Sequence, residues 1–337
     1  MTEMGKVEEG LGALFRELHG EEARIVAPRD ITVGWETQIV AFTLQVPGDE
    51  SLDLVVRIYS GNDGARKAEW EFNVMQRLGS AGYPVPRVYV YEAGEDTLGS
   101  PFLIMEWIRG GTLWDVFFNG PREKYGEILA LNARLMADLH NIPVSKVIPG
   151  AYRVRTRRRV LGRIGEEEDE LERHGLGTAF EQVVEWLKRN AERVTESPLC
   201  LIHQDLHPRN ILLRRDNSPV VIDWASCTVG DFREDLCWTG LLAGTFIDEA
   251  LRKELYDSYS EYSTRELLDL PYFEVYSGLR RLADVAVTLR AGALARGMRP
   301  EALREMENNM PHYSKVLSRV MSVTGQDATE LRRLLGV

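Results

Sequence analysis

The chain has 337 residues, of which 44% are hydrophobic and 28% charged, as expected for a globular protein with a sizeable core. Its formal net charge of −11 disfavours nucleic acid and anionic membranes as partners, because both favour a basic surface. The charge is compatible with a cationic small substrate, although acidic surfaces commonly serve solubility alone.

Cysteine usage and hydropathy bear on the compartment. No apolar run is long enough to span a bilayer, and the N-terminus lacks the apolar core of a secretory signal. Cys200, Cys227 and Cys237 form neither a C-x-x-C pair nor a disulfide framework. We therefore expect buried or half-buried thiols in a reducing cytoplasm.

The first hundred residues predict a helix followed by a sheet. Apolar residues recur with helical spacing over 11–19. Strands are expected over 25–33, 37–46 and 51–59, separated by turn residues, which gives an antiparallel meander. Pro28 weakens the first of these strands.

The third strand places a cation among apolar neighbours. Alternate residues face opposite sides of a strand, so Arg57 shares its face with Val55 and Tyr59. A helix expected over 63–78 carries Glu71 on its apolar stripe, where a carboxylate is costly unless paired. Arg57 is the natural partner. The alternatives are a rotated helix that presents Glu69, and an edge-strand Arg57 that reaches to water.

Further strands are expected over 87–91 and 101–107, before Arg109-Gly110-Gly111, which we interpret as a hinge. Thr112 is a suitable N-cap for a short helix over 113–118. A long amphipathic helix over 122–140 ends at His140, which we expect to interact with the helix dipole.

Two blocks of opposite charge follow, over 153–159 and 166–170. Such blocks are usually a solvated and mutually paired face. The alternative is that the acidic block forms a lid over an acceptor site.

The most informative stretch is Leu201–Asn210, with the sequence Leu-Ile-His-Gln-Asp-Leu-His-Pro-Arg-Asn, after a helix expected over 180–194. Asp205 and Asn210 lie in a polar loop that follows an apolar segment. A short hairpin over 211–222 then delivers Asp223 to the same end of a small sheet. Two carboxylates and an amide there could bind a hard cation through oxygen and leave one carboxylate to accept a proton.

Two other interpretations of this stretch are weaker. His203, Asp205 and His207 alternate and could ligate zinc if they lay on a strand, but Pro208 and the interval to Asn210 favour a loop. An Asp that caps a turn and an Asn in the left-handed region would explain either residue alone. They do not explain the whole ordered set.

The remainder of the chain reads as successive helices. Asp231 is a good N-cap for the first of them. Tyr256, Tyr259 and Tyr262 fall near one helical face, where their expected role is packing. The alternative is that some of them line an acceptor pocket.

The interval Asp-x-x-x-x-Asn is that of the kinase catalytic loop, in which the Asp accepts the substrate hydroxyl proton and the Asn binds Mg²⁺. His203–Asn210, together with Ile222-Asp223-Trp224 and the later Gly230-Asp231 and Asp235-Leu236, resembles the aminoglycoside phosphotransferase family, which is related to choline kinases. That family usually reads H-G-D-L-H-P-x-N, so Gln204 is a local departure.

The resemblance implies an α+β fold of the bilobal protein-kinase-like type. Residues 1–106 would form an antiparallel-sheet N-lobe and residues 107–337 a mainly helical C-lobe. The implied reaction transfers the γ-phosphoryl group of ATP to a hydroxyl of an aminoglycoside-like or other hydroxylated small molecule.

The resemblance also implies roles for single residues. Asp205 would be the catalytic base, and Asn210 and Asp223 would bind Mg²⁺. Arg57, fixed by Glu71, would hold the phosphates. Asp231 and Asp235 would support the catalytic loop.

The nucleotide site would be completed by a phosphate-covering turn and by the hinge. The turn contains Gly34, although a plain hairpin turn explains it equally well. Met105 would line the back of an adenine slot, unless it is an ordinary core methionine. Backbone groups of Glu106 and Ile108 would meet the edge of the base.

Two rival functions remain. A kinase-like module that binds nucleotide without chemistry is one, but the intact set of Asp205, Asn210 and Asp223 argues against it. A protein kinase is weaker still, because neither an Asp-Phe-Gly nor an Ala-Pro-Glu element follows Asp223. The acceptor stays open among aminoglycosides, macrolides, choline-like alcohols, sugars and amino-acid derivatives.

Overall fold

A computed structural model describes residues 3–32, 37–61, 63–150, 156–296, 298 and 301–336. The chain divides into two compact units. The first, which we call the sheet unit, comprises Met1–Gly111, Leu212–Ala225 and Gly297–Arg299. The second, the helical unit, comprises Thr112–Ile211, Ser226–Arg296 and Pro300–Val337.

The sheet unit contains a five-stranded antiparallel sheet in the order β1-β2-β3-β5-β4. The predicted meander is confirmed, and the strand bounds are β1 Arg24–Asp30, β2 Thr37–Gln45, β3 Leu52–Tyr59, β4 Val88–Glu92 and β5 Phe102–Glu106. A bulge between Val26 and Arg29 interrupts the pairing of β1 with β2. Pro28, the residue that weakened this strand in the sequence, lies inside the bulge, as expected for an edge strand.

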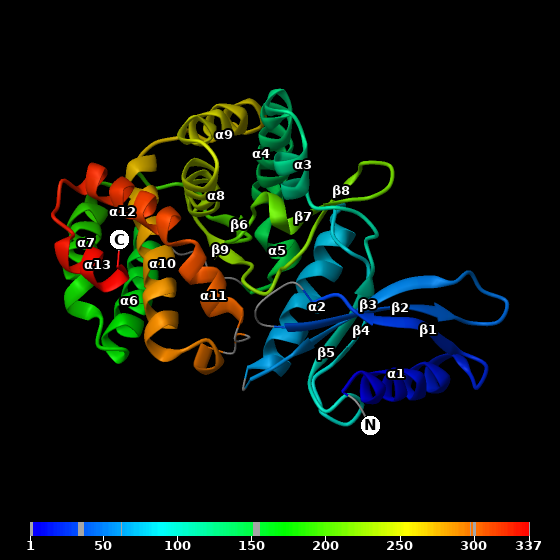
Figure 1. The fold of residues 1–337 in the computed structure, drawn as a ribbon. Coiled ribbons are helices and arrows are strands. Elements are labelled where there is room, and N and C mark those ends of the chain that lie inside the picture. The colour runs from blue at the N-terminus through cyan, green and yellow to red at the C-terminus, as the bar shows by residue number, and fades with distance from the viewer. Residues whose placement is uncertain are drawn as a thin grey trace. The chain divides into compact units, whose positions relative to one another are not determined.

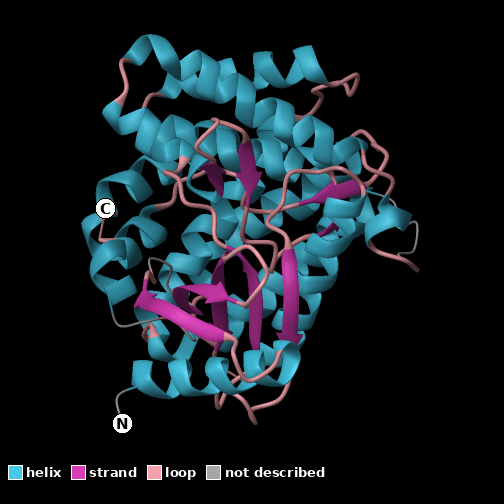
Figure 2. Ribbon diagram, turned by 90° about the vertical axis from the view of Figure 1, so that its right-hand side faces the viewer, coloured by secondary structure: helices cyan, strands magenta, loops and turns pink. Residues whose placement is uncertain are grey.

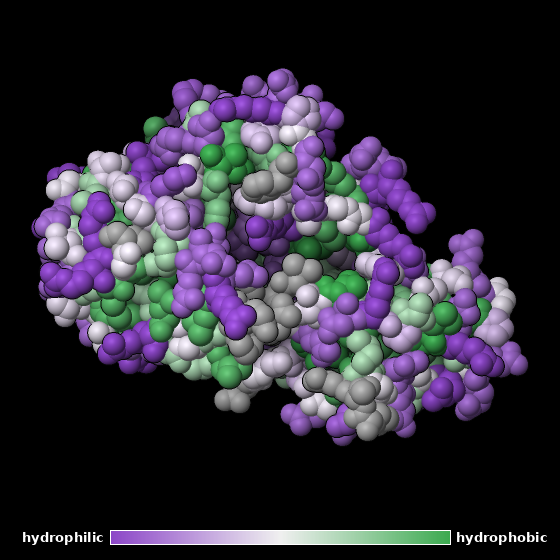
Figure 3. Space-filling model, in the orientation of Figure 1, coloured by the Kyte–Doolittle hydropathy of each residue, from purple (hydrophilic) through white to green (hydrophobic). Residues whose placement is uncertain are grey.

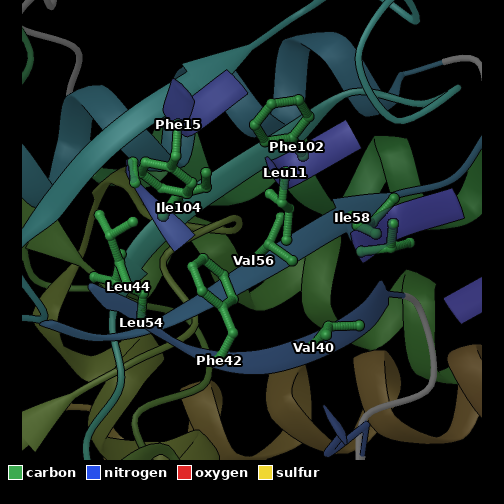
Figure 4. Packing of buried hydrophobic residues seen from close by; sticks show 12 residues of the cluster. Leu11, Phe15, Val40, Phe42, Leu44, Leu54, Val56, Ile58, Phe102 and Ile104 are labelled. Carbon is green, nitrogen blue, oxygen red and sulfur yellow. The ribbon is translucent and has the colours of Figure 1, made fainter. Parts of the chain in front are cut away.

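Helix α1 (Glu3–His19) and helix α2 (Gly64–Ser80) belong to this unit. Leu11 and Phe15 of α1 pack against Phe42, Val56 and Ile104 of the sheet in one buried apolar cluster (Figure 4). Figures 1 and 2 show α1 lying along the sheet. Since alternate residues of β3 face opposite sides, the apolar cluster leaves the other face of β3 to Arg57 and α2.

The expected hinge glycine is explained by a close backbone approach. A Cβ atom on Gly110 would lie 1.6 Å from the carbonyl oxygen of Leu213, so only glycine fits there. Leu213 belongs to the predicted hairpin, which the structure shows as β7 (Ile211–Leu213) and β8 (Pro219–Val221). The Arg214 side chain in its turn forms an ion pair with Glu106, and the hairpin is thereby fixed to the end of β5.

The helical unit is built around α8, most of whose residues are buried. Strands β6 (Cys200–Ile202) and β9 (Thr228–Gly230) pair antiparallel beside it. The α-helices of this unit, including α8, are shown in Figure 1 and have the bounds α3 Leu113–Asn119, α4 Tyr125–Asn141, α5 Val144–Val147, α6 Thr156–Arg173, α7 Gly177–Asn190, α8 Phe232–Phe246, α9 Glu249–Tyr262, α10 Leu270–Ala291, α11 Glu301–Asn308, α12 Met310–Thr324 and α13 Thr329–Leu335.

Both predicted helix caps are confirmed. Thr112 caps α3 in a capping box with Asp115, and Asp231 caps α8 in a capping box with Glu234. Each cap satisfies backbone N–H groups that a helix start leaves without a partner.

One surface expectation is wrong in part. Tyr256 and Tyr259 are buried and pack as expected, but Tyr262 is 41% exposed because α9 ends there.

In the acidic block, Glu168 forms an ion pair with Lys188, and Glu170 forms ion pairs with Arg173 and Arg296. These partners lie outside the basic block over 153–159, and Arg159 of that block donates to Val229 and Thr228 instead, so the described residues do not show the two blocks paired with each other.

Large exposed hydrophobic side chains such as Leu18, Leu268 and Leu294 are scattered along the described chain. In Figure 3, hydrophobic residues occur in small patches among hydrophilic ones. Within the described residues, no helix is both long enough and apolar enough to cross a membrane. Cys200, Cys227 and Cys237 are buried, as expected, and none of them forms a disulfide within the described residues.

Candidate active site

Asp205 lies in the loop that follows β6, and three side chains of the helical unit contact its carboxylate. The indole Nε1–H of Trp238 donates to Oδ1 at 2.7 Å. The Nδ2–H of Asn210 donates to Oδ2 at 3.2 Å and to the Asp205 carbonyl at 2.8 Å. His207 Nε2 lies 3.3 Å from Oδ1. The structure therefore brings together Asp205 and Asn210, and it holds the carboxylate in one orientation.

Electrostatics favour the ionised form of this carboxylate. Burial alone would raise the pKa of Asp205, but the charge and hydrogen bond of His207, the Trp238 indole and the charge of His203 together hold that pKa well below its ordinary value. The side chain remains 40% exposed. Asp205 thus presents an ionised and accessible carboxylate that can accept a hydrogen bond from a hydroxyl group.

Asp235 of α8 braces the backbone on the N-terminal side of Asp205, as expected. Its carboxylate accepts from the N–H of His203 at 2.8 Å and from the N–H of Gln204 at 2.5 Å. His140 Nε2 lies 3.3 Å from the same carboxylate, and His140 Nδ1 lies 2.8 Å from the hydroxyl of Tyr259. His140 therefore joins α4 to the brace, which the helix-dipole expectation did not foresee.

On the other side of Asp205, the carbonyl of Leu206 accepts from Asn132 Nδ2 at 3.2 Å and from Thr239 Oγ1 at 2.7 Å. Helices α4 and α8 thus fix the loop from both sides. Asp231, expected to support the same loop, instead caps α8 and binds Arg233.

In the sheet unit, Arg57 is the centre of a second cluster. Its Nη1–H donates to Glu71 at 2.9 Å, its Nη2–H donates to Asp223 at 2.9 Å, and its Nε–H donates to Thr37 at 3.1 Å. The predicted pair of Arg57 and Glu71 is therefore present. Glu71 is fully buried and Glu69 is exposed, which decides between the two helix rotations.

Glu71 also accepts from the Tyr59 hydroxyl and from the backbone N–H of Trp224 at 3.0 Å. Burial raises the pKa of Glu71, although Arg57 acts in the opposite direction. Asp223 carries a side chain that is 41% exposed and a backbone φ of +70°, a strained conformation for a non-glycine residue. Its hydrogen bond to Arg57 was not anticipated from the sequence.

The hinge residues also lie in the sheet unit. The N–H of Glu106 donates to the Arg87 carbonyl at 2.8 Å, and the N–H of Trp107 donates to the Asp53 carbonyl at 2.9 Å. The Ile108 carbonyl accepts from the N–H of Gly110 at 3.0 Å. Met105 is buried. Gly34 lies outside the described residues.

Among the described residues, no group of three or more His, Cys, Asp and Glu side chains is arranged to hold a metal ion. His203 is fully buried, and its Nδ1 accepts from the N–H of Asp205 at 3.3 Å. Its role in this structure is to shape the loop.

Residues 29–270 of the chain match the model of the phosphotransferase enzyme family, which is well over half of its length. The chain belongs to this family.

Curated relatives of this phosphotransferase are much longer proteins. Acyl-CoA dehydrogenase family member 11 of Rattus norvegicus is 27% identical over 184 residues, which make up 52% of this chain and 23% of that protein. The Homo sapiens protein of the same name is 27% identical over 179 residues, 51% of this chain and 22% of its own. The chain thus spans less than a quarter of the length of these relatives.

Solved structures share its α+β fold. Aminoglycoside phosphotransferase APH(4)-Ia in the apo form has a TM-score of 0.65 at 17% identity, with 94% of this chain and 98% of that chain covered. Its ternary complex with ADP and hygromycin B has a TM-score of 0.63 at 18% identity with the same coverage. Macrolide 2'-phosphotransferase type I has a TM-score of 0.59 at 18% identity, with 92% and 95% covered.

The departure at Gln204 has a structural consequence in this phosphotransferase. Gln204 has a φ of +73°, in the left-handed region that favours glycine. The glycine usual at this place in the related motif would adopt that conformation without strain. The N–H of Gln204 is held by Asp235, so the loop keeps its shape in spite of the side chain.

The contact of Trp238 with Asp205 is the feature of this site that the sequence did not reveal. In the sequence Trp238 was one of several apolar residues on a helix, and its polar ring nitrogen gave no indication of a partner 33 residues away. A tryptophan three residues after Asp235, on the helix that braces the loop, would be the signal to look for.

Proposed function

We propose that this phosphotransferase is an ATP-dependent kinase that transfers the γ-phosphoryl group to a hydroxyl of a small molecule. The observation that supports the proposal best is the ionised Asp205 carboxylate, oriented by Trp238 and Asn210. Solved neighbours in complex with ADP, or with AMP-PNP and hygromycin B, support the use of a nucleotide and of a hydroxylated acceptor.

Asp205 would act on the acceptor. Its carboxylate accepts the hydrogen bond of the hydroxyl group and so directs the hydroxyl oxygen toward the γ-phosphorus. As the new P–O bond forms and the bond to the ADP oxygen breaks, the hydroxyl proton passes to Asp205. Because the pKa of Asp205 is low, we expect this proton to move late, and positioning then contributes more than basicity.

Arg57 would hold the phosphates of the nucleotide. Its Nη2–H now donates to Asp223, and phosphate oxygens can replace this partner while Glu71 keeps the guanidinium in place. The Glu106 carbonyl and the Ile108 N–H would bind the base edge, with Met105 behind it. The segment around Gly34 would cover the phosphates.

Asn210 and Asp223 would bind Mg²⁺. Asn210 donates through Nδ2 to Asp205, which leaves its amide oxygen to face a cation, and Asp223 has a half-exposed carboxylate. Oxygen donors of this kind suit Mg²⁺. The bound ion would neutralise charge on the phosphates during transfer.

The setting of the reaction follows from these assignments. The partner would be a hydroxylated small molecule, and neither nucleic acid nor a membrane is required. Buried free thiols and the use of ATP fit a cytoplasmic enzyme.

A screen for acceptor-dependent ADP release tests the proposal. Purified protein with Mg·ATP is offered hydroxylated antibiotics, sugars, amino alcohols and hydroxy acids, and phosphorylated products are identified by mass spectrometry. We expect turnover with at least one class of acceptor. Thermal stabilisation by Mg·ATP without turnover on the whole panel would instead favour the rival function, a kinase-like module that only binds nucleotide.

A further inference from the structure

The guanidinium group of Arg280 and the carboxylate of the proposed base, Asp205, both contact the indole of Trp238. Arg280 of α10 places its guanidinium carbon 4.6 Å from the ring centroid of Trp238, and the Nε1–H of the same indole donates to Asp205 Oδ1 at 2.7 Å. Trp238 is only 8% exposed, so its position is well determined by packing. A positive charge is therefore held close to the place where an acceptor hydroxyl would bind.

This guanidinium has an unused hydrogen-bonding nitrogen. Nη1 of Arg280 is buried, and no atom of the described chain accepts a hydrogen bond from it. A buried donor without a partner is costly, and in native structures it usually indicates a missing water, ion or ligand.

The carboxylates nearest to Arg280 are engaged elsewhere or held at a distance. Glu234 accepts from the N–H of Asp231 at 3.0 Å and lies 3.3 Å from Arg163. Burial raises the pKa of Glu167, and the charge of Arg280 acts to lower it. The two side chains share no hydrogen bond. These acidic groups compensate the charge of Arg280 without satisfying its donors.

Two basic side chains, His207 and Arg209, follow Asp205 in the same segment. His207 contacts its carboxylate, and Arg209 stacks on Trp114 with its guanidinium carbon 4.8 Å from the ring centroid. A polycationic acceptor would meet like charge here, which is unfavourable at short range in a partly buried site. The acidic net charge of the whole chain therefore does not describe the surroundings of the base.

We propose that Arg280 is a specificity-determining residue that binds an anionic group, a carboxylate or a phosphate, on the acceptor. This inference rests on the proposed function, since it assigns the acceptor class of the same site. Arginine suits the task because its planar fork can bind two oxygens at once.

A binding experiment tests the site without requiring turnover. Four probes share one scaffold: glycerol, D-glycerate, glycerol 3-phosphate and 3-aminopropane-1,2-diol. Calorimetric titration of the full chain should show at least one anionic probe binding about 10-fold or more tighter than glycerol, as expected for a charged hydrogen bond. The aminodiol should bind no better than glycerol.

Variants of two neighbouring arginines make the test specific. Arg280→Gln should remove the preference for anionic probes, and Arg280→Lys should keep part of it. Arg281→Gln is the matched control, because Arg281 lies next in α10 but packs on Tyr313, 5.2 Å from its ring centroid, and should leave the preference unchanged. Comparison of D-glycerate with glycerol 3-phosphate then distinguishes a carboxylate from a phosphate.

The outcomes separate the two proposals. If no anionic probe binds wild-type protein better than Arg280→Gln, the assignment of Arg280 is wrong, whatever the phosphotransfer assays show. Phosphorylation of glycerol or the aminodiol at rates equal to the anionic probes would also overturn it, while the kinase function would stand. Arg280-dependent binding without phosphoryl transfer to any acceptor would refute the kinase function and retain the anion site.

Discussion

The Trp238 side chain sets the orientation and charge of the carboxylate that we propose as the catalytic base, Asp205. Its N–H points at Asp205 Oδ1 at 2.7 Å, and its ring is buried on α8. An indole donor in this position both orients the carboxylate and stabilises its charge. The base would therefore be prepared before the acceptor arrives.

Replacing Trp238 by Phe should test this role. Phe keeps most of the ring volume but removes the donor, so we expect kcat to fall about 10-fold, the equivalent of one charged hydrogen bond, with little change in KM for ATP. Steady-state kinetics with an accepted substrate measure both quantities. Trp186→Phe is the control, because Trp186 lies on α7 and stacks on Tyr272 of α10 in the helical unit. Equal kcat in the Trp238 variant and wild type would remove Trp238 from the mechanism.

Gln204 offers a second test at the residue scale. Its φ of +73° costs a non-glycine residue about 1 kcal/mol. Gln204→Gly should therefore raise the free energy of unfolding by about 0.5 kcal/mol, after allowance for the more flexible unfolded chain. Gln76→Gly, the same substitution inside α2, should lower it by about 1 kcal/mol. Urea denaturation of both variants decides, and a loss of stability in both would contradict the strain at Gln204.

Much at this scale could be predicted from the sequence, because it depends on spacing. The alternation of β3 and the apolar stripe of α2 placed Arg57 and Glu71 opposite each other, and the structure confirms it. The hydrogen bonds of Trp238 to Asp205 and of Arg57 to Asp223 could not be predicted. Each joins residues distant in sequence, 33 and 166 positions apart, whose meeting depends on the packing of whole elements.

At the scale of elements, α2 and the segment after β8 meet at one buried carboxylate. Glu71 accepts hydrogen bonds from Arg57 of β3, from Tyr59 of the same strand and from the backbone of Trp224. Removing its charge leaves a buried guanidinium with only Asp223 as a charged partner.

Glu71→Gln should therefore lower the free energy of unfolding by about 3 kcal/mol, the typical effect of breaking a buried ion pair, and should weaken Mg·ATP binding. Thermal denaturation with and without Mg·ATP measures both effects. Glu69→Gln on the exposed face of α2 should change neither by more than about 0.5 kcal/mol. Equal stability and equal Mg·ATP binding in the two variants would show that the ion pair between β3 and α2 contributes to neither.

Helix α8 fixes the catalytic loop through Asp235. The carboxylate is fully buried, and burial alone would raise its pKa. His140, through its hydrogen bond and its charge, instead lowers that pKa below its ordinary value of 3.8. The charge of His203 and the hydrogen bond from its backbone N–H act in the same direction. The ionised form is thus favoured by folding. Its contribution to stability is present above pH 3.8 and is lost as the pH falls through the lower folded-state pKa.

Asp235→Asn should lower the free energy of unfolding by about 3 kcal/mol at neutral pH, since it removes the charge from a buried network. The difference from wild type should be constant between pH 7 and pH 5 and should shrink below pH 3.8. Denaturant unfolding at pH 7, 5 and 3.5 measures the difference. A gap that widens in acid would show that Asp235 is not the group stabilised in its ionised form.

At the scale of the whole molecule, the proposed reaction takes residues from both units. Arg57, Glu71 and Asp223 belong to the sheet unit, whereas Asp205 and Asn210 belong to the helical unit. The hairpin of β7 and β8 lies between Asn210 and Asp223 in the sequence, so only residues 211–222 separate these two proposed metal ligands along the chain. The family's motif is compact in sequence for this reason, and it could be recognised from the sequence alone.

The identity of the acceptor is harder to predict from the sequence than the family motif. In our proposal its recognition depends on Arg280, which comes from a helix without a recognisable motif. Composition gives no specific indication, because a net charge of −11 averages over the whole surface, whereas recognition depends on the few side chains around Asp205.

The central claim is that Asp205 is the base of a phosphotransfer reaction, and Asp205→Asn tests it most directly. The variant keeps the shape of the side chain but removes its charge. With an accepted substrate, single-turnover transfer from ATP should slow by about 10²–10⁴-fold, while the calorimetric Kd for Mg·ATP stays within about 3-fold of wild type. Transfer at the wild-type rate in a correctly folded variant would contradict the account.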